Sequence, residues 1–351
     1  MPPRSVIRRR TLGAASVALA AGVFAPWIGA QSTGKSSAGR VTVAVAGQSE
    51  MYHLPLLLAD QLGYFRAEGL DVVLRDFTAG APALQALQDG VVDVVSGAYE
   101  HTIRQQARGL ALRSVVLHGR APQVALGVSM RAAPRYDSLR DLAGLRIGVS
   151  APGSSTHTFA RWIMAREGLL ASEATFVAVP SGAAALAALR SGQIQAICHS
   201  DPIMAQAEQK LGVRVVADTR TLKASQELFG GNMPASCLYA TQAFIQKQPE
   251  QVQAMVHAVV HTLKWLQTAE PADMIKALPP AYLSGDRALY LAAFYRMRET
   301  FSPHGMMPED GPTVALRMLS LVFPEVASAR VDLSRTFSNE WARKARQRFN
   351  L

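Results

Sequence analysis

The sequence predicts an α/β protein made of two similar lobes with a ligand cleft between them. Three observations lead to this fold class. Short apolar strands alternate with helical patterns, the alternation restarts near Leu145, and one helix–strand unit occurs twice. Alternation of this kind predicts βαβ units and a largely parallel sheet in each lobe.

The first lobe opens with an apolar strand that begins at Val41 and ends at Gly47. Helical periodicity and short apolar runs then alternate along the chain. We expect helices over 56–62, 82–88 and 101–108, and strands over 72–74, 92–95 and 114–117. Apolar runs this short favour buried strands rather than helices.

The second lobe repeats this pattern. We expect strands over 145–149, 176–179, 194–197 and 213–216, and a helix over 154–167. The segment 79–90 resembles 181–192, with Gly80, Leu84, Leu87 and Gly90 matched at one constant offset. A Leu-x-x-Leu helix can recur by chance because it packs well anywhere. The constant offset and the strand after each copy favour two related lobes.

After Asp218 the α/β alternation stops. A strand is expected over 236–240, followed by helices over 249–267, 286–300, 313–322 and 339–348. The runs 124–130 and 237–240 are candidate crossover strands. We therefore assign residues 40–128 plus 234–351 to lobe one with the C-terminal helices, and residues 129–233 to lobe two.

The N-terminus has the pattern of an export signal. A basic cluster, Arg8–Arg10, precedes an apolar run over 12–28 that is too short and weakly apolar to span a membrane comfortably. An uncleaved anchor is the alternative. The cluster fits the twin-arginine pattern, so Tat and Sec export both stay open. We expect residues 1–30 to be a signal peptide cleaved near Ala30, and 31–39 to be a flexible leader.

Composition argues against several functional classes. The formal net charge is +10, but many of the cations lie in the export segment and the C-terminal tail. No basic–aromatic stripe, zinc spacing, phosphate loop or metal motif is present, so no nucleic acid, metal or cofactor is expected. The two cysteines, Cys198 and Cys237, could pair outside the cytoplasm. Two small buried apolar side chains are the favoured interpretation.

The candidate ligand contacts lie where strands end, because open parallel sheets bind ligands beyond the carboxyl ends of their strands. The repeat offset pairs Tyr99 with Asp201, and we expect the two to face each other across the cleft. Asp201 could instead cap the following helix. Tyr52 could form a stacking wall and His53 a hydrogen-bond donor, or the two could staple the next helix. His157, one step into its helix, could face ligand or solvent.

The segment Gly153–Thr156 predicts an anion site. Hydroxyl side chains and free backbone N–H groups at a helix start combine with the positive end of the helix dipole. Ordinary N-capping by Ser154 or Ser155 is the alternative. The carboxylates Glu100 and Asp201, expected opposite this loop, hint at a zwitterionic ligand.

Three stretches carry a family resemblance in combination. They are Met51–Pro55 with Ala59–Val72, Gly90–Gly97, and Leu142–Val149 with Gly153–His157. Together they resemble the periplasmic binding proteins for nitrate, sulfonates and taurine, a grouping that includes binders of thiamine-pyrimidine precursors. The resemblance covers about residues 40–245 and implies a two-lobed, type II-like periplasmic-binding-protein fold. The candidate ligand contacts are then Gln48, Tyr52, His53, Ser96, Gly97, Tyr99, Glu100, Gly153, Ser154, Ser155, Thr156, His157 and Asp201.

The resemblance implies the substrate-binding component of an ABC importer rather than an enzyme. Such a protein, expected to be monomeric, would capture a small organic anion or zwitterion in the periplasm and deliver it to a membrane permease. The solute would be sulfonate-like, taurine-like or nitrate-like. Alternatives are a pyrimidine-precursor binder, a periplasmic sensor protein, or a pyrimidine-synthase-like enzyme. The enzyme's cysteine-rich signature is absent, and Ser154 lacks a nucleophile elbow.

Overall fold

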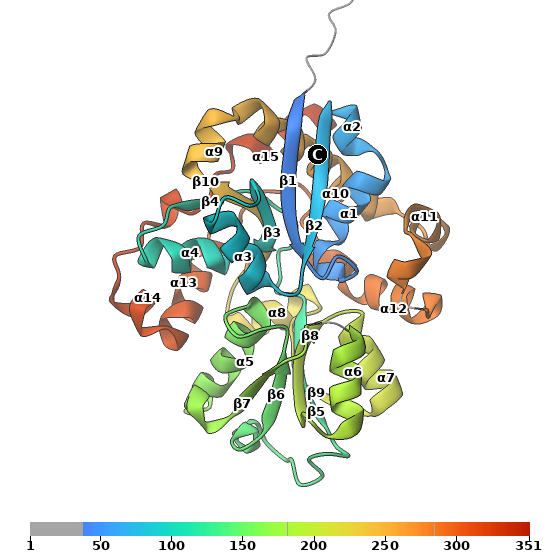
Figure 1. The fold of residues 1–351 in the computed structure, drawn as a ribbon, viewed down its shortest axis with the longest axis vertical. Helices are drawn as coiled ribbons and strands as arrows, with labels where there is room; N and C mark the ends of the chain where they lie inside the picture. Colours follow the sequence, from blue (N-terminus) through green and yellow to red (C-terminus); the bar gives the residue numbers. More distant parts are fainter. Residues whose placement is uncertain (1–37, 181, 284) are drawn as a thin grey trace, which may run out of the picture. The chain divides into compact units, whose positions relative to one another are not determined.

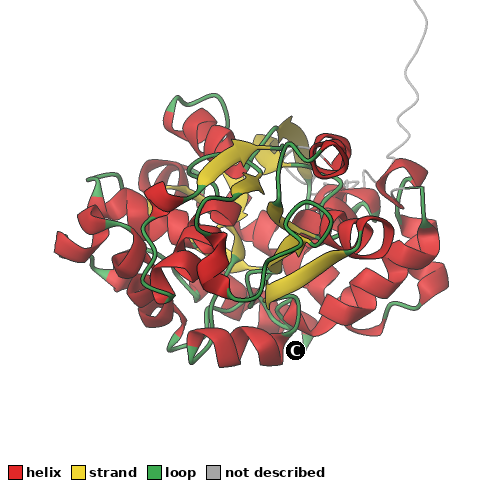
Figure 2. Ribbon diagram, turned by 90° about the horizontal axis from the view of Figure 1, so that it is seen from below, coloured by secondary structure: helices red, strands yellow, loops and turns green. Residues whose placement is uncertain are grey.

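The computed structural model describes residues 38–180, 182–283 and 285–351 of the chain, which build two five-stranded sheets with helices around them (Figures 1 and 2). The expected signal peptide lies outside the described residues. The leader expected over 31–39 extends too far, because Ala38 and Gly39 already belong to the first strand. Among the described residues, no helix combines the length and apolarity needed to cross a membrane.

The first sheet has the strand order β2-β1-β3-β10-β4. Its strands are β1 (Ala38–Ala46), β2 (Leu70–Phe77), β3 (Val94–Ala98), β4 (Leu112–Leu117) and β10 (Ser236–Thr241). Strand β1 pairs in parallel with β2 and β3, whereas β10 runs antiparallel to both of its neighbours. Four strands therefore point the same way, as expected for a largely parallel sheet.

The second sheet repeats this topology with the order β7-β6-β8-β5-β9. Its strands are β5 (Val124–Ser129), β6 (Arg146–Val149), β7 (Thr175–Ala178), β8 (Ala196–Ser200) and β9 (Val213–Asp218). Strand β5 is the antiparallel member here, between β8 and β9. Helices α3 (Gly80–Gln88) and α6 (Gly182–Ser191) precede β3 and β8. The repeated unit seen in the sequence thus occupies equivalent places in the two lobes.

The expected lobe boundary at residue 128 is wrong, because it would cut through β5. This strand pairs along its length with β8 and β9, so the change of lobe comes before Val124. The chain returns to the first sheet with β10. Both crossover strands were expected, but the sheet that a strand joins depends on partners far away in the sequence.

The helices cover both sheets and complete the two lobes (Figure 1). Beyond α3 and α6 they are α1 (Leu54–Gln61), α2 (Tyr64–Ala67), α4 (Glu100–Ala107), α5 (Ser155–Arg166), α7 (Ile203–Leu211), α8 (Leu222–Phe229), α9 (Gln242–Lys247), α10 (Pro249–Thr268), α11 (Pro271–Ala277), α12 (Arg287–Met297), α13 (Gly311–Val322), α14 (Pro324–Ser328) and α15 (Glu340–Phe349). Helix α10 buries a long apolar face in the core of the first lobe, with Met255, Val259 and Leu263 almost fully covered.

The C-terminal helices contact both lobes rather than the first alone. Helix α12 reaches α7 of the second lobe through ion pairs from Arg296 to Glu208 and from Asp286 to Lys210, each at 3.4 Å. Helix α13 packs against α5 of the second lobe. Both cysteines are buried with free thiols, as the favoured interpretation had it.

Candidate functional site

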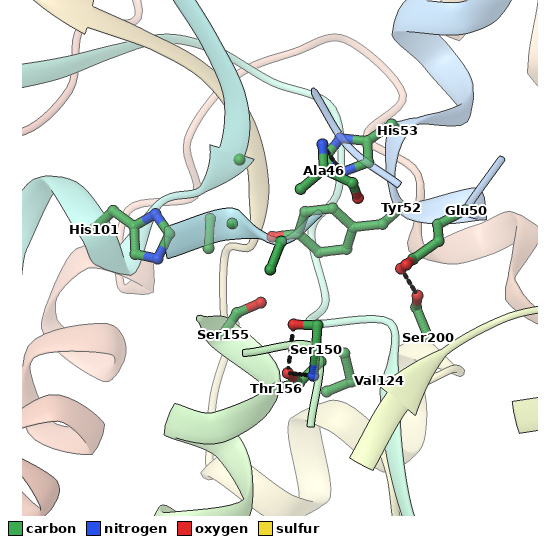
Figure 3. Close-up of a pocket in the computed structure, with 14 residues that line it drawn as sticks. Ala46, Glu50, Tyr52, His53, His101, Val124, Ser150, Ser155, Thr156 and Ser200 are labelled. Carbon is green, nitrogen blue, oxygen red and sulfur yellow. Dashed lines mark hydrogen bonds between the residues drawn. The ribbon is translucent and has the colours of Figure 1, made fainter. Parts of the chain in front are cut away.

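A cavity lies between the two lobes, where strands of both sheets end (Figure 3). It is a small cavity of about 40 Å³, partly open to solvent. Five stretches of the first lobe and the strand ends of the second contribute to its wall. The lining residues are Ala46, Glu50, Tyr52, His53, Ala79, Gly80, Gly97, Ala98, His101, Val124, Ser150, Ser155, Thr156 and Ser200.

Two helices begin at this cavity, one from each lobe. Helix α3 starts at Gly80 after an extended Ala79, and α5 starts at Ser155 after an extended Ser154. The first N–H groups of a helix have no partner within the helix, and the helix dipole makes this end positive. In α3 the Ala81 N–H already donates to Ser154 and Pro82 has no N–H, so this end acts mainly through its dipole. Two such ends at one cavity are suited to a negatively charged group.

Two buried polar side chains at the cavity each have one atom without a hydrogen-bond partner among the described residues. The Tyr52 side chain is 7% exposed, and its hydroxyl has no hydrogen-bond partner among the described residues. His101 is 2% exposed; its Nδ1 lies 3.0 Å from the Tyr239 hydroxyl, while its Nε2 has no partner within the described part of the chain. A buried polar atom without a partner lowers stability unless a ligand or water completes it. These two atoms therefore point to a bound polar group.

His53 lines the cavity, but its ring nitrogens are engaged within the first lobe. Nδ1 lies 2.9 Å from the Ser96 hydroxyl, and Nε2 lies 3.1 Å from the carbonyl oxygen of Ala46. Burial lowers the pKa of His53 to about 4, so the ring is neutral at pH 7. Ser96, also an expected contact, lies behind His53 and outside the cavity wall. The pair positions the loop after β1.

The three hydroxyl side chains at the start of α5 make different contacts. The Oγ1 atom of Thr156 accepts the Ser150 N–H at 3.0 Å and lies 2.8 Å from the Ser150 hydroxyl, which fixes the loop. The Oγ atom of Ser154 accepts the Ala81 N–H at 2.9 Å, a contact between the lobes. Ser155 directs its hydroxyl toward the cavity (Figure 3).

Glu50 is a cavity residue that the sequence analysis did not single out. Its carboxyl accepts a hydrogen bond from the Ser200 hydroxyl of the second lobe. Burial raises the pKa of Glu50 to about 8; the Ser200 hydrogen bond lowers it, and the charge of Asp76 raises it. Glu50 also lines a wider outer cleft of about 1340 Å³ between the lobes, with Asp76 and Pro202. It therefore stands between the inner cavity and the outer cleft.

Tyr99 and Asp201 do not face each other across the cleft, contrary to expectation. Tyr99 is fully buried in the first lobe, with its hydroxyl 2.6 Å from Oγ1 of Thr336. Asp201 is fully buried in the second lobe, where its Oδ1 lies 3.3 Å from the Arg220 guanidinium. Equivalent places in a repeat fix backbone position, but each side chain turns into its own lobe.

Three further expected contacts lie outside the cavity wall. Gln48 is half-buried, and its backbone N–H donates to Asp76 at 3.0 Å. The Gly153 N–H donates to Nδ1 of His157 at 3.0 Å, which holds the turn before α5. The His157 ring packs edge-on against Phe176 at 4.5 Å. These residues shape the loops rather than line the cavity.

Glu100 lies in a tight annex that shares Tyr52, Val124 and Ser155 with the cavity and adds only about 10 Å³. Apolar side chains dominate its wall: Pro122, Phe159, Phe229, Met233, Ala235 and Met318. Glu100 is 8% exposed, and its Oε1 has no hydrogen-bond partner among the described residues. Burial raises the pKa of Glu100 to about 7, while the charge of Arg104 lowers it.

Among the described residues, no cluster of three or more His, Cys, Asp or Glu side chains could hold a metal ion. The site instead offers neutral groups: two helix ends, hydroxyl groups and the imidazole of His101. Burial lowers the pKa of His101 to about 4, so this ring is also neutral at pH 7.

Comparisons with known proteins place this architecture in a family. A solved protein of Bordetella bronchiseptica RB50 is 45% identical, with a TM-score of 0.86, over 89% of this chain and 98% of that one. The alkanesulfonate-binding protein SsuA from Xanthomonas axonopodis pv. citri, solved bound to MOPS, is 21% identical, with a TM-score of 0.62, over 86% of this chain and 98% of that one. The latter likeness concerns the fold.

A shorter match connects the chain to enzymes. A 4-amino-5-hydroxymethyl-2-methylpyrimidine phosphate synthase of Saccharomyces cerevisiae is 33% identical over 79 residues, which is 22% of this chain and 23% of that protein. The chain thus matches only about a quarter of the length of these curated relatives. Residues 50–273 match the family described as NMT1/THI5 like. This protein, with its two-lobed periplasmic-binding-protein fold, belongs to the NMT1/THI5-like family.

Proposed function

We propose that this protein is the substrate-binding component of an ABC importer and captures a small organic anion outside the cytoplasm. One observation carries the proposal: two helix N-termini meet at an inter-lobe cavity. The same cavity holds the Tyr52 hydroxyl and the His101 Nε2, which have no hydrogen-bond partner among the described residues. The similarly folded SsuA, named as an alkanesulfonate-binding protein, supports it.

The cavity favours an anion held by neutral donors. No arginine or lysine is among the residues that line it. Positive helix ends and hydroxyl groups would therefore supply the attraction, through charge-assisted hydrogen bonds to the anionic head. A sulfonate or a carboxylate group suits such a set of donors.

The annex favours an organic solute over nitrate. Its wall of Phe159, Met233 and Met318 continues directly from the cavity past Tyr52 and Ser155. Burial of an apolar ligand group there would add about 25 cal/mol for each Å² removed from water. A solute with an anionic head and an apolar body would contact this wall by displacing side chains of the tight annex, whereas nitrate would not reach it.

A pyrimidine-precursor binder is the second candidate. The match to the pyrimidine phosphate synthases supports it, as do the ring of Tyr52 and the protonatable carboxyls of Glu50 and Glu100 beside the cavity. A heterocycle could stack on Tyr52 and exchange hydrogen bonds with these carboxyls. A synthase-like enzyme or a sensor protein would share the same cavity.

A ligand panel tests the proposal. We expect an organic sulfonate or carboxylate to raise the melting temperature of the mature protein, because a ligand at a hundred times its Kd adds about 2.7 kcal/mol to stability. That corresponds to roughly 5 °C or more for a protein of this size. The panel contains alkanesulfonates, taurine, arylsulfonates, nitrate and aminopyrimidines. Stabilisation by aminopyrimidines alone would replace the proposal with the second candidate, and no response to any organic anion would refute it.

The importer role needs a separate test. We propose export, a monomeric state and delivery to a membrane permease, which the basic N-terminal cluster and the shared fold support. Uptake of the stabilising anion by cells should stop when this gene is deleted and return when it is restored. Unchanged uptake in the deletion strain would favour the sensor role.

A further inference from the structure

We propose that capture of the anion is coupled to the uptake of one proton by Glu50. This inference rests on the proposed function, since it describes what the same cavity does when an anion enters. The neutral, protonated carboxyl would then face the ligand in place of a negative charge.

Glu50 is placed where closure of the lobes changes its surroundings most. It follows β1 in the first lobe. Its carboxyl accepts a hydrogen bond from the hydroxyl of Ser200, which lies at the end of β8 in the second lobe. Next to it, the Met51 N–H donates to the carbonyl oxygen of Asp201 at 3.0 Å, again between the lobes. With these contacts made, the Glu50 side chain is only 14% exposed. If the lobes part, both contacts break and water returns to the carboxyl.

Among the described residues, the groups that face Glu50 include no cation to balance an ionised carboxylate. Asp76 at the end of β2 adds a negative charge, and Tyr52 and His53 on its own side are neutral. His199 of β8 places Nδ1 at 3.7 Å from the Glu50 carboxyl. That Nδ1 accepts the Ser200 N–H at 3.1 Å, so it carries no proton. Burial lowers the pKa of His199 to about 4, which keeps the ring neutral.

The direction of the pH effect follows from these surroundings. In the closed form the pKa of Glu50 is about 8, whereas an exposed glutamate has a pKa near 4.3. The closed form therefore binds a proton that the open form lacks between these two values. The affinity is full below about pH 4.3 and falls about tenfold for each pH unit up to about pH 8. An anion in the cavity strengthens the effect, because it disfavours a second negative charge.

Titration calorimetry tests the coupling directly. Butanesulfonate is a suitable probe because its head group does not titrate near neutral pH, so every proton exchanged comes from the protein. Binding is measured at pH 7 in imidazole and in Tris, two cationic buffers that do not compete for an anion site and whose ionisation enthalpies differ. We expect close to one proton taken up per ligand by the wild type and none by Glu50→Gln. We also expect the affinity of Glu50→Gln to change much less than that of the wild type between pH 5.5 and 7.5, where the wild type loses about tenfold per unit.

Glu100→Gln is the matched control, because Glu100 is the other buried carboxyl beside the cavity. It should keep the proton uptake whatever its affinity. Binding by the wild type without proton uptake, or uptake that disappears in Glu100→Gln and persists in Glu50→Gln, overturns the inference. If butanesulfonate does not bind, the infrared band of protonated carboxyl groups decides in the ligand-free protein. The inference requires Glu50 to be ionised there at pH 7, so the wild type and Glu50→Gln should show the same band at pH 7 and differ only near and below pH 4.3. A larger band in the wild type at pH 7 would mean that Glu50 already holds its proton without ligand, and it overturns the inference independently of the proposed function.

Discussion

Ser155 offers the sharpest test of the anion site. Its hydroxyl points into the cavity at the first position of α5 (Figure 3). Ser155→Ala would remove one hydrogen bond to a charged group, which contributes about 1.5–3 kcal/mol. The affinity for the anion should fall roughly ten- to a hundredfold. Stability should hold, because alanine is a good helix former and Ser154, not Ser155, is the N-cap residue.

Ser155→Asp should abolish binding. A carboxylate about 4 Å from the anion repels it by about 4 kcal/mol at an effective dielectric constant near 20. That corresponds to about a thousandfold in affinity. The same carboxylate suits the positive end of α5, so the melting temperature should be unchanged or slightly higher. This opposition between affinity and stability separates a ligand contact from a helix cap.

Titration calorimetry with the anion identified by the panel, and a melting curve for each variant, supply the readouts. Thr241→Ala is the control, because Thr241 caps α9 by accepting the Phe244 N–H at 3.2 Å, away from the cavity. It should lower stability by about 1 kcal/mol and leave affinity alone. If Ser155→Asp binds the anion like the wild type, the assignment of this helix end to the ligand is wrong.

Four further predictions test other parts of the molecule. Tyr52→Phe should weaken anion binding about tenfold, because it removes a donor that faces the cavity. The ligand-free variant should be at least as stable as the wild type, because the buried hydroxyl has no partner among the described residues. Loss of stability without loss of affinity in calorimetry would contradict this. Arg220→Met should lower stability by about 3–5 kcal/mol, because it strands the fully buried Asp201, and the melting temperature should fall by roughly 10 °C; an unchanged melting curve would show that the ion pairs add nothing. Small-angle scattering should show a smaller radius of gyration with saturating ligand, as in hinge closure, and an identical envelope would argue against it. N-terminal sequencing of the exported protein should begin at or near Gln31, and an intact Met1 in the periplasmic fraction would disprove cleavage.

Local patterns predicted most of the fold. The sequence predicted strands β1, β3 and β8 from their apolar runs, and helices α3 and α6 from the repeated segment. These elements could be predicted because each depends on residues that are neighbours in the sequence. Helix α8 was missed, although Thr221 caps its start and Gly230 ends it in the left-handed region. The lobe boundary was misplaced because membership of β5 in the second sheet is a long-range property.

The site was predicted only in part, for a physical reason. Ser155 and Thr156 follow a strand and open a helix, which the sequence shows directly. Tyr99 and Asp201 were misplaced because a strand end tells where the backbone lies, not to which face a side chain turns. His101 was missed, because its place at the cavity depends on how the chain passes from β3 into the first turn of α4. Glu50 was not predicted, because in the sequence it is a loop residue and its contact with Ser200 comes from the other lobe.

The contacts between the lobes explain why closure should depend on ligand. The hydrogen bonds from Ala81 to Ser154 and from Met51 to Asp201 hold the lobes together around the cavity. Closure also buries the Tyr52 hydroxyl and the His101 Nε2, which have no partner among the described residues. Each such burial lowers the stability of the closed form by about 1–3 kcal/mol. Without ligand these contributions nearly cancel, since a hydrogen bond adds only about 0.5–1.5 kcal/mol. An anion that accepts from the free donors removes the penalty and shifts the balance toward the closed form.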